Sequence, residues 1–529
     1  CSDPSTLEAH CFSLPGGDLA MGVWKSNDAD DSLALTVNDP SFDSLYIVDL
    51  MSGEREKVSG VSGNGEGGMT VDGIVIGKRP LVLEATVEGR SPVSPGSSFY
   101  FAEGYTGQGF QEYLCLGNAD DEPAEAWVEF LFPDGESREL RVNIPVGFRT
   151  TVDVNSIVGP AREVSAVVTS EKDIVAERPI YFEYQGCGGG HVSTGSDRPA
   201  ETLYFAEGYT GQGFDEWICV LNPGDFPGNL AFHFQTQEEG EKVVDGLGVP
   251  PRSRSTFKVN EILGLDYQAS CTLYSDHPVV AERSMYFDYS GRSAPGWRGG
   301  HCVAGVPILA KGYYFAEGTT RNGFDMWLIL QNPHTSSINV TAVYRFGDGQ
   351  GPQLVEDYGL EPGKRFSVFV PEVVGRDKDV SVELSSSSSF LAERPLYFDY
   401  RGDGAPGWQG GHCVTGATSA SREWFFAEGY TGQGFQQWLC LLNPGEGDAT
   451  VELDYMTQEE GALEPREVVV PAGRRVTLTV NRSAGPDYQL SCRLCVTSGP
   501  GVVVERPMYF DCGGRAGGHD VVGFTIDAL

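Results

Sequence analysis

The sequence is poor in basic residues. Its 529 residues include 37 Lys and Arg against 74 Asp and Glu, a formal net charge of −37. A surface this negative repels the phosphate backbone of nucleic acids and anionic lipid headgroups, whereas it attracts divalent cations. We therefore predict that nucleic acid is not a partner.

Long apolar runs and enzyme signatures are also missing. No stretch of 18 or more apolar residues occurs, so no segment is predicted to span a bilayer. The HExxH, GxSxG and SxxK signatures do not occur in a supporting context, and nothing singles out a nucleophile. We therefore predict that the chain is not an enzyme. It opens on Cys1 without an initiator Met, which fits a processed chain or a fragment.

The sequence contains no convincing helical period. Glycine and proline are frequent instead, at 69 and 31 residues, which is typical of a turn-rich β protein. A hydrophobic content of 40% and an aromatic content of 11% are sufficient for packed cores, so wholesale disorder is not expected.

An internal repeat organises most of the chain. The segment FAEGYTGQGF at 101–110 returns unchanged at 205–214 and 426–435, and as FAEGTTRNGF at 315–324, in steps of 104, 110 and 111 residues. Each copy is followed by AERPIYF, AERSMYF, AERPLYF or VERPMYF and then by Gly-Gly-His. Because the period is that of a small domain, we predict five parts. They are an N-terminal unit at 1–96, repeat 1 at 97–201, repeat 2 at 202–311, repeat 3 at 312–421 and repeat 4 at 422–529.

Segments such as WVEFLF and RTTVDVN in repeat 1 alternate apolar and polar residues as strands do. About seven such strands per repeat predict tandem immunoglobulin-like antiparallel β-sandwiches in an all-β protein. The N-terminal unit also reads as short strands separated by turns and is predicted to be a further β-sandwich.

Two resemblances accompany these motifs. FAEGYTGxGF, AERPMYF and GGH together resemble an uncharacterised repeat domain of bacterial secreted and cell-surface proteins, which implies an extracellular multidomain chain without a known chemistry. VWKSNDADDSL, VDLMSGE and PLVLEA in the N-terminal unit are similar to the accessory β-sandwich of secreted glycoside hydrolases. The catalytic barrel of those enzymes has no counterpart here, so no active-site residue is carried over.

Twelve cysteines are present, and the repeats give some of them a pattern. Repeats 2 and 4 each have two cysteines at equivalent positions, whereas repeat 3 has neither. Joint presence and joint absence predict a disulfide between neighbouring strands, and Cys residues in repeat 4 that replace Tyr residues of repeat 2 predict a third. The predicted pairs are Cys219–Cys271, Cys440–Cys492 and Cys495–Cys512. Stable disulfides require an oxidising compartment, so an extracellular or cell-surface location is expected.

The other cysteines leave alternatives open. Cys1 is either lipid-modified or paired with Cys11. Cys115 and Cys187 are candidates for a bond within repeat 1, and Cys302 and Cys413 are candidates for links between subunits.

A Glu-Arg pair recurs in each repeat, first as Glu177 and Arg178. Alternation along a strand places these two side chains on opposite faces, so they are not predicted to pair with each other. We expect each Arg to meet the Glu of the glycine loop in its own repeat and to fix strand register. A catalytic role for the carboxylates is the alternative, although an adjacent Arg lowers a carboxyl pKa, which disfavours a general acid. The predicted pairs are Arg178 with Glu103, Arg283 with Glu207, Arg394 with Glu317 and Arg506 with Glu428.

The glycine loop and the Gly-Gly-His segments each have two interpretations. A phosphate-binding loop requires a helix after it and a basic residue, whereas strands flank this loop, so we predict a tight positive-φ turn. The histidines are either metal ligands shared with the acidic loop of the next unit or junction residues hydrogen-bonded to backbone or Glu, and we favour the second. These histidines are His191, His301, His412 and His519.

Trp297 and Trp408 lie in Gly/Pro-rich segments before Gly-Gly-His. They either stack on a sugar ring or fasten one repeat to the next. Asn27 to Ser32 is rich in oxygen ligands and is the one candidate for Ca²⁺; no other metal or cofactor is predicted.

These observations predict a secreted structural protein: a cell-surface, sheath or filament subunit, or an adhesive stalk, built as a stiff disulfide-braced rod that self-associates. The alternative is a non-catalytic carbohydrate-binding tail of a secreted glycoside hydrolase, with a cell-surface glycan as its partner.

Overall fold

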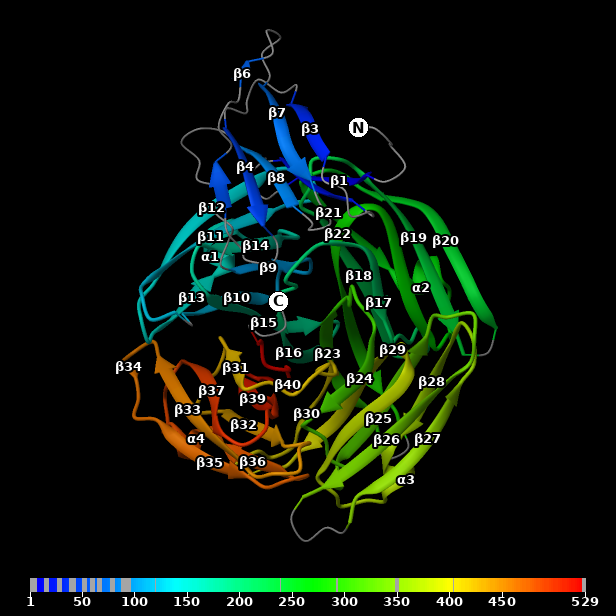
Figure 1. Cartoon of the computed structure of the whole chain (residues 1–529). Helices are drawn as coiled ribbons and strands as arrows, with labels where there is room; N and C mark the ends of the chain where they lie inside the picture. Colours follow the sequence, from blue (N-terminus) through cyan, green and yellow to red (C-terminus); the bar gives the residue numbers. More distant parts are fainter. Residues whose placement is uncertain are drawn as a thin grey trace. The chain divides into compact units, whose positions relative to one another are not determined.

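The structure is a computed structural model (Figure 1). It describes residues 97–118, 120–237, 239–291, 294–347, 352–402 and 404–525 in full, and the backbone of eight strands between residues 7 and 86. The chain divides into two compact units, Cys1–Ser94 and Pro95–Leu529. Within the described residues, no helix has the length and apolar character needed to cross a membrane.

The first unit consists of antiparallel strands, as its sequence predicts. One sheet has the order β1-β2-β8-β4-β5 and the other has the order β3-β7-β6. The strands are β1 (Leu7–Ser13), β2 (Leu19–Lys25), β3 (Asp31–Val37), β4 (Ser44–Asp49), β5 (Arg55–Lys57), β6 (Ser62–Gly63), β7 (Met69–Ile76) and β8 (Leu81–Thr86).

Repeat 1 contains two antiparallel four-stranded sheets, with the orders β13-β10-β15-β16 and β12-β11-β14-β9. The strands are β9 (Ser97–Phe101), β10 (Gln111–Asn118), β11 (Ala124–Leu131), β12 (Ser137–Ile144), β13 (Arg149–Asp153), β14 (Ser165–Ser170), β15 (Ile174–Tyr184) and β16 (Cys187–Thr194).

Repeats 2 and 3 keep this pattern, but one long strand in each, β22 or β29, contributes to both sheets. Repeat 2 has β17 (Ala200–Phe205), β18 (Phe214–Asn222), β19 (Gly228–Thr236), β20 (Gly240–Val249), β21 (Ser253–Lys258), β22 (Ala269–Tyr289) and β23 (Trp297–Ala304). Repeat 3 has β24 (Ala310–Phe315), β25 (Phe324–Asn332), β26 (Ile338–Phe346), β27 (Leu354–Leu360), β28 (Lys364–Phe369), β29 (Val380–Tyr400) and β30 (Trp408–Thr415).

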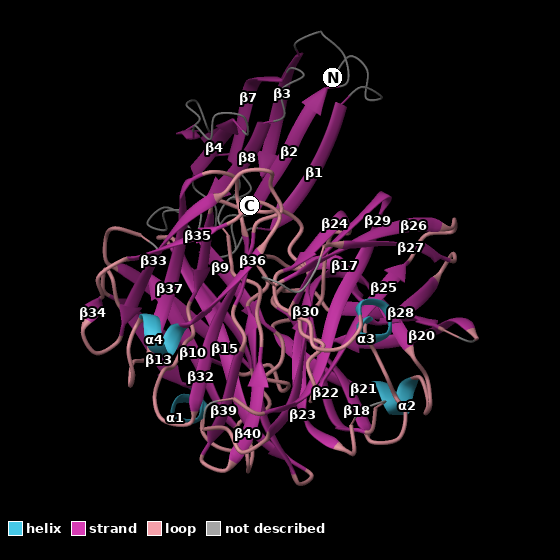
Figure 2. Cartoon of the chain, turned by 90° about the horizontal axis from the view of Figure 1, so that it is seen from below, coloured by secondary structure: helices cyan, strands magenta, loops and turns pink. Residues whose placement is uncertain are grey.

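Repeat 4 again has two sheets, around β33 and β32. Its strands are β31 (Glu423–Phe426), β32 (Phe435–Leu442), β33 (Ala449–Thr457), β34 (Gly461–Ala462), β35 (Arg466–Val470), β36 (Arg475–Thr479), β37 (Leu490–Ser498), β38 (Val503–Glu505), β39 (Met508–Cys512) and β40 (Arg515–His519). Within the described residues each repeat has one short helix, labelled in Figure 2: α1 (Val154–Val158), α2 (Val259–Ile262), α3 (Val370–Val374) and α4 (Val480–Ser483).

The burial of the strands follows their sequence. In β11 the side chains of Ala124, Ala126, Val128 and Phe130 are buried and alternate with half-buried neighbours, as expected when one face of a sheet covers a core. In contrast, β15 is buried along nearly its whole length. Both faces of β15 are therefore buried, and the face that does not cover the core of repeat 1 packs against other repeats.

The four repeats of the second unit form a closed ring, not the end-to-end rod that the sequence predicts. The last strand of each repeat lies at the centre, where β16, β23, β30 and β40 contact one another in turn and β40 contacts β16 (Figure 1). Residues of repeat 4 bond directly to repeat 1, as in the pair between Arg506 and Glu177. Repeat 4 therefore packs against both repeat 3 and repeat 1.

The Gly-Gly pairs allow this close approach at the centre. A β-carbon on Gly299 would lie 2.9 Å from the Cα of Gly410, and one on Gly517 would lie 3.1 Å from the Cα of Gly189. Contacts this short are not available to a residue with a side chain, so larger residues here would push the repeats apart.

Candidate functional site

The four recurring arginines are completely buried at the junctions between repeats. Each forms the predicted ion pair with the glycine-loop Glu of its own repeat. The separations are 3.3 Å for Arg178 and Glu103, 3.2 Å for Arg283 and Glu207, and 2.9 Å for Arg506 and Glu428; Arg394 and Glu317 form the remaining pair.

Each arginine also binds a second carboxylate, which comes from the following repeat and was not predicted. Arg178 lies 2.6 Å from Glu282, Arg283 lies 2.8 Å from Glu393, and Arg394 lies 3.0 Å from Glu505. Arg506 lies 3.0 Å from Glu177, which closes the circle. Glu177 therefore pairs with Arg506 and not with its neighbour Arg178. This confirms the prediction from strand alternation that adjacent residues face opposite sides.

The same carboxylates accept backbone hydrogen bonds across the junctions. The amides of Glu103 and Glu428 donate to Glu282 and Glu177 over 2.7 Å. The corresponding carboxylates, Glu393 and Glu505, accept from the amides of Ala206 and Ala316. We refer to these arginines and carboxylates as the bridge circle.

A second set of buried arginines crosses the junctions toward backbone carbonyls. Arg254 of repeat 2 donates to the carbonyl oxygens of Gly104 and Val164 in repeat 1, both over 2.7 Å. Arg365, Arg475 and Arg149 donate in the same way to Gly208, Gly318 and Gly429. The sequence does not indicate that these arginines reach another repeat.

Aromatic side chains make the same kind of contact at each of the four junctions between repeats. Phe182 meets Tyr286 edge to face with ring centres 5.0 Å apart, and the same geometry recurs at the other three junctions. Tyr289 and Tyr397 stack at 4.0 Å, as do Tyr400 and Tyr509 at 3.9 Å. The equivalent position in repeat 4 is Cys512.

The glycine loop has the predicted backbone. Gly109, Gly213, Gly323 and Gly434 all have φ between 84° and 89°. Strands flank each loop, and a β-carbon on Gly104 would lie 2.3 Å from the carbonyl oxygen of Val164. The loop is therefore packed tightly against its surroundings, with no helix at its end to hold a phosphate.

The four junction histidines are each 2% exposed. Neither ring nitrogen of any of them has an aligned hydrogen-bond partner among the described residues. The predicted bond to backbone or Glu is therefore wrong for His191, His412 and His519, whereas His301 Nε2 lies 3.4 Å from Glu207 Oε2 without an aligned hydrogen bond. Burial and the nearby arginine lower the pKa of His191 and of His301 to about 3, and lower the pKa of His412 and His519 well below the usual range. All four imidazoles are therefore neutral near pH 7.

Among the described residues, three junctions bring such a histidine together with two further ligand-type side chains. The groups are Glu103, His191 and Cys302; Glu207, His301 and Cys413; and Glu317, His412 and Asp520. In each group one ligand atom per residue lies within 4.8 Å of the others. We call these groups the 1–2, 2–3 and 3–4 triads. The Glu comes from the same repeat as the His, not from the next unit as the metal alternative assumed, and the third residue comes from the next repeat.

A further buried carboxyl lies behind the glycine loop in repeats 1 and 2. Burial raises the pKa of Glu112 to about 8 and that of Glu216 to about 7. Glu112 accepts a hydrogen bond from the amide of Tyr105 over 3.0 Å, and Gln437 of repeat 4 accepts the same bond from Tyr430. An uncharged side chain is therefore sufficient to accept the hydrogen bond from the glycine-loop amide at this position.

The three predicted disulfides are wrong, because all six cysteines are free thiols. Cys219 lies on β18 opposite Glu282 and faces Arg254, whereas Cys271 pairs with Phe205 and Phe234 in the other sheet and faces the repeat core. In repeat 4, Cys440 accepts from Arg475, and Cys495 and Cys512 also lie in different sheets. The recurrence of Cys219 and Cys440 reflects this contact with arginine.

Cys115, Cys187, Cys302 and Cys413 are free thiols as well. Cys302 and Cys413 are each 4% exposed, which prevents them from linking subunits. Cys1, the side chain of Cys11 and the Ca²⁺ candidate at Asn27 to Ser32 lie outside the residues whose side chains are described.

The two loop tryptophans are buried, at 3% exposure for Trp297 and 5% for Trp408. Trp297 packs near Tyr289, and Trp408 stacks on Tyr400 at 6.1 Å. The prediction that these tryptophans are exposed and stack on a sugar is therefore wrong. Their buried environment fits the alternative, in which they pack within the protein.

A cleft opens beside repeat 4, with a cavity volume of about 1040 Å³. It is lined by residues of repeats 3 and 4, among them Arg321, Arg401, Trp408, Gln433, Trp438 and Arg482. Trp438, one of the lining residues, is half-buried.

Comparisons with known proteins give little guidance. No protein-family model and no curated protein matches the sequence. Among solved structures, a Thermotoga maritima protein, Thermotoga maritima 1070, is similar over 21% of this chain and 96% of its own length, at 18% identity and a TM-score of 0.19. The Anabaena sensory rhodopsin transducer is similar over 17% of this chain and 96% of its own length, at 25% identity and a TM-score of 0.15. Similarity at this level carries no argument about function.

Proposed function

We propose that the chain is a non-catalytic structural module of a secreted or cell-surface protein, in which four immunoglobulin-like repeats act as one rigid ring. The bridge circle is the observation that carries this proposal. It places the recurring Glu and Arg side chains in buried bonds between repeats, where they are inaccessible to a substrate. The formal charge of −37 suits a crowded surface layer, since like charges keep such proteins soluble.

Self-association of the ring is supported by its outer strands. Within the described part of the ring, β12, β20, β27 and β35 each pair with one neighbouring strand only, so each has an open edge. Val243, Val355 and Val469 on three of these strands are about half exposed, at 51%, 51% and 50%. The proposed partner is a second copy of the same chain, added edge to edge.

Electron microscopy of the full chain tests this proposal. We expect regular filaments or sheets that are lost in the variant V243K/V355K/V469K, because lysine on an edge strand opposes pairing. V146K is the matched control, since Val146 is 43% exposed but lies outside the strands. Dispersed particles at every concentration, or assemblies that persist in the triple variant, would contradict self-association through these edges.

Glycan binding is a second candidate, favoured by the cleft beside repeat 4. Its half-buried Trp438 and polar lining are suited to a sugar ring and its hydroxyl groups. Glycan-array binding by the full chain that is lost in W438A and kept in W327A, the equivalent residue of repeat 3, would support this candidate. Equal binding by both variants would place the glycan elsewhere.

A further inference from the structure

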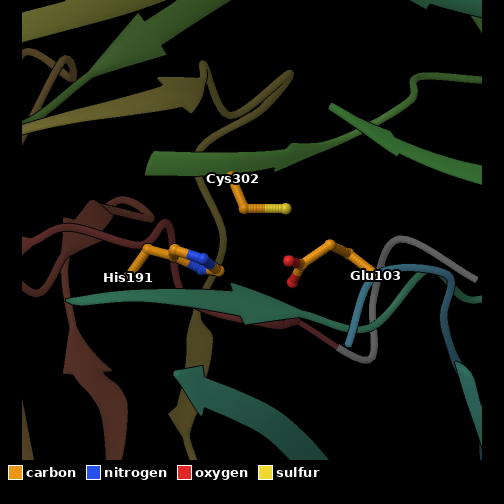
Figure 3. Close-up of side chains that lie close together, drawn as sticks. All are labelled: Glu103, His191 and Cys302. Carbon is orange, nitrogen blue, oxygen red and sulfur yellow. The ribbon is translucent and has the colours of Figure 1, made fainter. Parts of the chain in front are cut away.

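We propose that the 1–2, 2–3 and 3–4 triads bind divalent transition-metal ions of the zinc class, and that the fourth junction does not. Figure 3 shows the 1–2 triad, in which Glu103, His191 and Cys302 point into a common space. His191 comes from β16 and Cys302 from β23, so each ion would join two repeats.

The chemistry of the donors selects the metal. The 1–2 and 2–3 triads each offer one imidazole nitrogen, one thiol sulfur and one carboxylate oxygen, which are the ligands that zinc prefers. The 3–4 triad replaces the sulfur with Asp520. Three atoms at most 4.8 Å apart share a centre no more than about 2.8 Å from each, so coordination at ~2.0–2.3 Å requires an inward shift of at most about 0.5–0.8 Å per ligand.

The histidines provide an independent observation. His191, His301 and His412 are each 2% exposed, and both ring nitrogens of each lack a hydrogen-bond partner. A buried polar group without a partner is costly, and a metal ion would satisfy one nitrogen directly. His301 Nε2 already lies 3.4 Å from Glu207 Oε2, the second ligand of its triad.

The charges around each triad also favour a divalent cation. In the 1–2 triad Arg178 carries one positive charge against the carboxylates of Glu103 and Glu282, and a thiolate at Cys302 would bring the local charge to −2. In the 3–4 triad Arg394 faces the carboxyl groups of Glu317, Glu505 and Asp520, and burial raises the pKa of Glu505 well above its usual range. Two carboxylates then face one guanidinium, so the local charge of this group is −1. A divalent ion makes the 1–2 group neutral and offsets the negative charge of the 3–4 group. At the cysteine sites, binding forms one metal–sulfur bond and releases the thiol proton to the buffer.

The third ligands are reached from the centre of the ring. Cys302, Cys413 and Asp520 line a central cavity of about 350 Å³, which provides an entry path. Val192 also lines this cavity, and it follows His191 as Cys302 follows His301. The junction of repeat 4 with repeat 1 has Glu428 and His519, but Val192 supplies no ligand atom.

Metal retention by the purified full chain tests the proposal. The protein is stripped with a chelator, loaded with Zn²⁺, washed with excess Ca²⁺ to displace ions from surface carboxylates, and analysed for bound zinc. We expect three zinc ions per chain. C302V, C413V and D520V each lose one ion, and because they copy the natural Val192 they are expected to fold. H519N keeps three ions, and V192C gains a fourth.

Cobalt supplies a second readout. Co²⁺ bound to thiolate gives a sulfur-to-metal absorption band, which we expect in the wild type and in D520V but not in C302V/C413V. Retention of less than one zinc ion per chain would overturn the proposal. Equal retention by the wild type and by C302V/C413V/D520V would also overturn it, because the zinc would then be bound to surface carboxylates. Circular dichroism of each variant checks that it is folded.

Discussion

Replacing Arg506 with Met tests the energetic role of the bridge circle at the point where it closes. Arg506 lies 3.0 Å from Glu177 and 2.9 Å from Glu428, and all three side chains are at most 3% exposed. The substitution leaves two buried carboxylates without their cation. Breaking a buried ion pair in this way costs ~3–5 kcal/mol, so we expect R506M to lower the free energy of unfolding by about that amount.

Urea unfolding measured by both tryptophan fluorescence and circular dichroism gives this quantity, provided that the two transitions coincide. R298M is the control, since Arg298 forms an exposed pair with Asp288 and its loss is expected to cost under ~1 kcal/mol. The variant R506M/E177Q/E428Q removes the uncompensated charges and is expected to recover part of the loss. A loss below ~1 kcal/mol in R506M would refute the argument, as would a triple variant no more stable than R506M.

Two further predictions concern single side chains. Because burial raises the pKa of Glu112 to about 8, the folded state holds a proton that the unfolded state releases near pH 4.3, and stability is lost as pH rises from there to 8. E112Q should therefore resemble the wild type in urea unfolding at pH 4 and be more stable at pH 8.5, by up to about 4–5 kcal/mol; an equal difference at both pH values would contradict this assignment. G411A places a β-carbon 2.7 Å from Phe287 and should lower the melting temperature, at a cost of about 1–3 kcal/mol. In G359A the nearest atom to the new β-carbon is 3.8 Å away, so the melting temperature should not fall. If both substitutions lowered the melting temperature equally, close packing at the centre would be contradicted.

The strands of the ring were predictable because their pattern is local. Alternation in β11 and similar strands reports one buried face, and the structure has strands there. The pairing of Arg178 with Glu103 was also predictable, since both residues recur together in every repeat. Such recurrence identifies partners within a repeat but does not give the orientation of one repeat relative to the next.

Closure of the ring depends on contacts that no repeat makes alone. Glu282 looks the same in sequence whether it meets solvent or Arg178 of another repeat. One indication was present in β15. From Ile174 to Phe182 it is apolar on both faces apart from its Glu-Arg pair, and a strand of this kind is covered on both sides. The cysteine pattern gave a wrong prediction because the joint recurrence of two cysteines was attributed to a disulfide. Cys219 instead contacts Arg254, and Cys271 packs in the core of its repeat.

The triads were hidden for the same reason. His191 and Glu103 belong to one repeat, but Cys302 is supplied by the next, at a position where repeat 1 has Val192. Reading the residue after each Gly-Gly-His across repeats gives Val, Cys, Cys and Asp, which is an indication that three of these positions carry ligand atoms.

An engineered disulfide between repeats 1 and 4 tests ring closure most directly. A β-carbon on Gly188 would lie 3.8 Å from the Cβ of Arg515, within the ~3.5–4.5 Å range of natural disulfides. In a C187S/C512S background, which removes the two half-exposed thiols nearby, G188C/R515C should form an intramolecular disulfide on mild oxidation, identified by mass spectrometry of the linked peptides. If the repeats instead lie end to end, repeat 1 and repeat 4 are held apart by two whole repeats, and no intramolecular linked peptide would form.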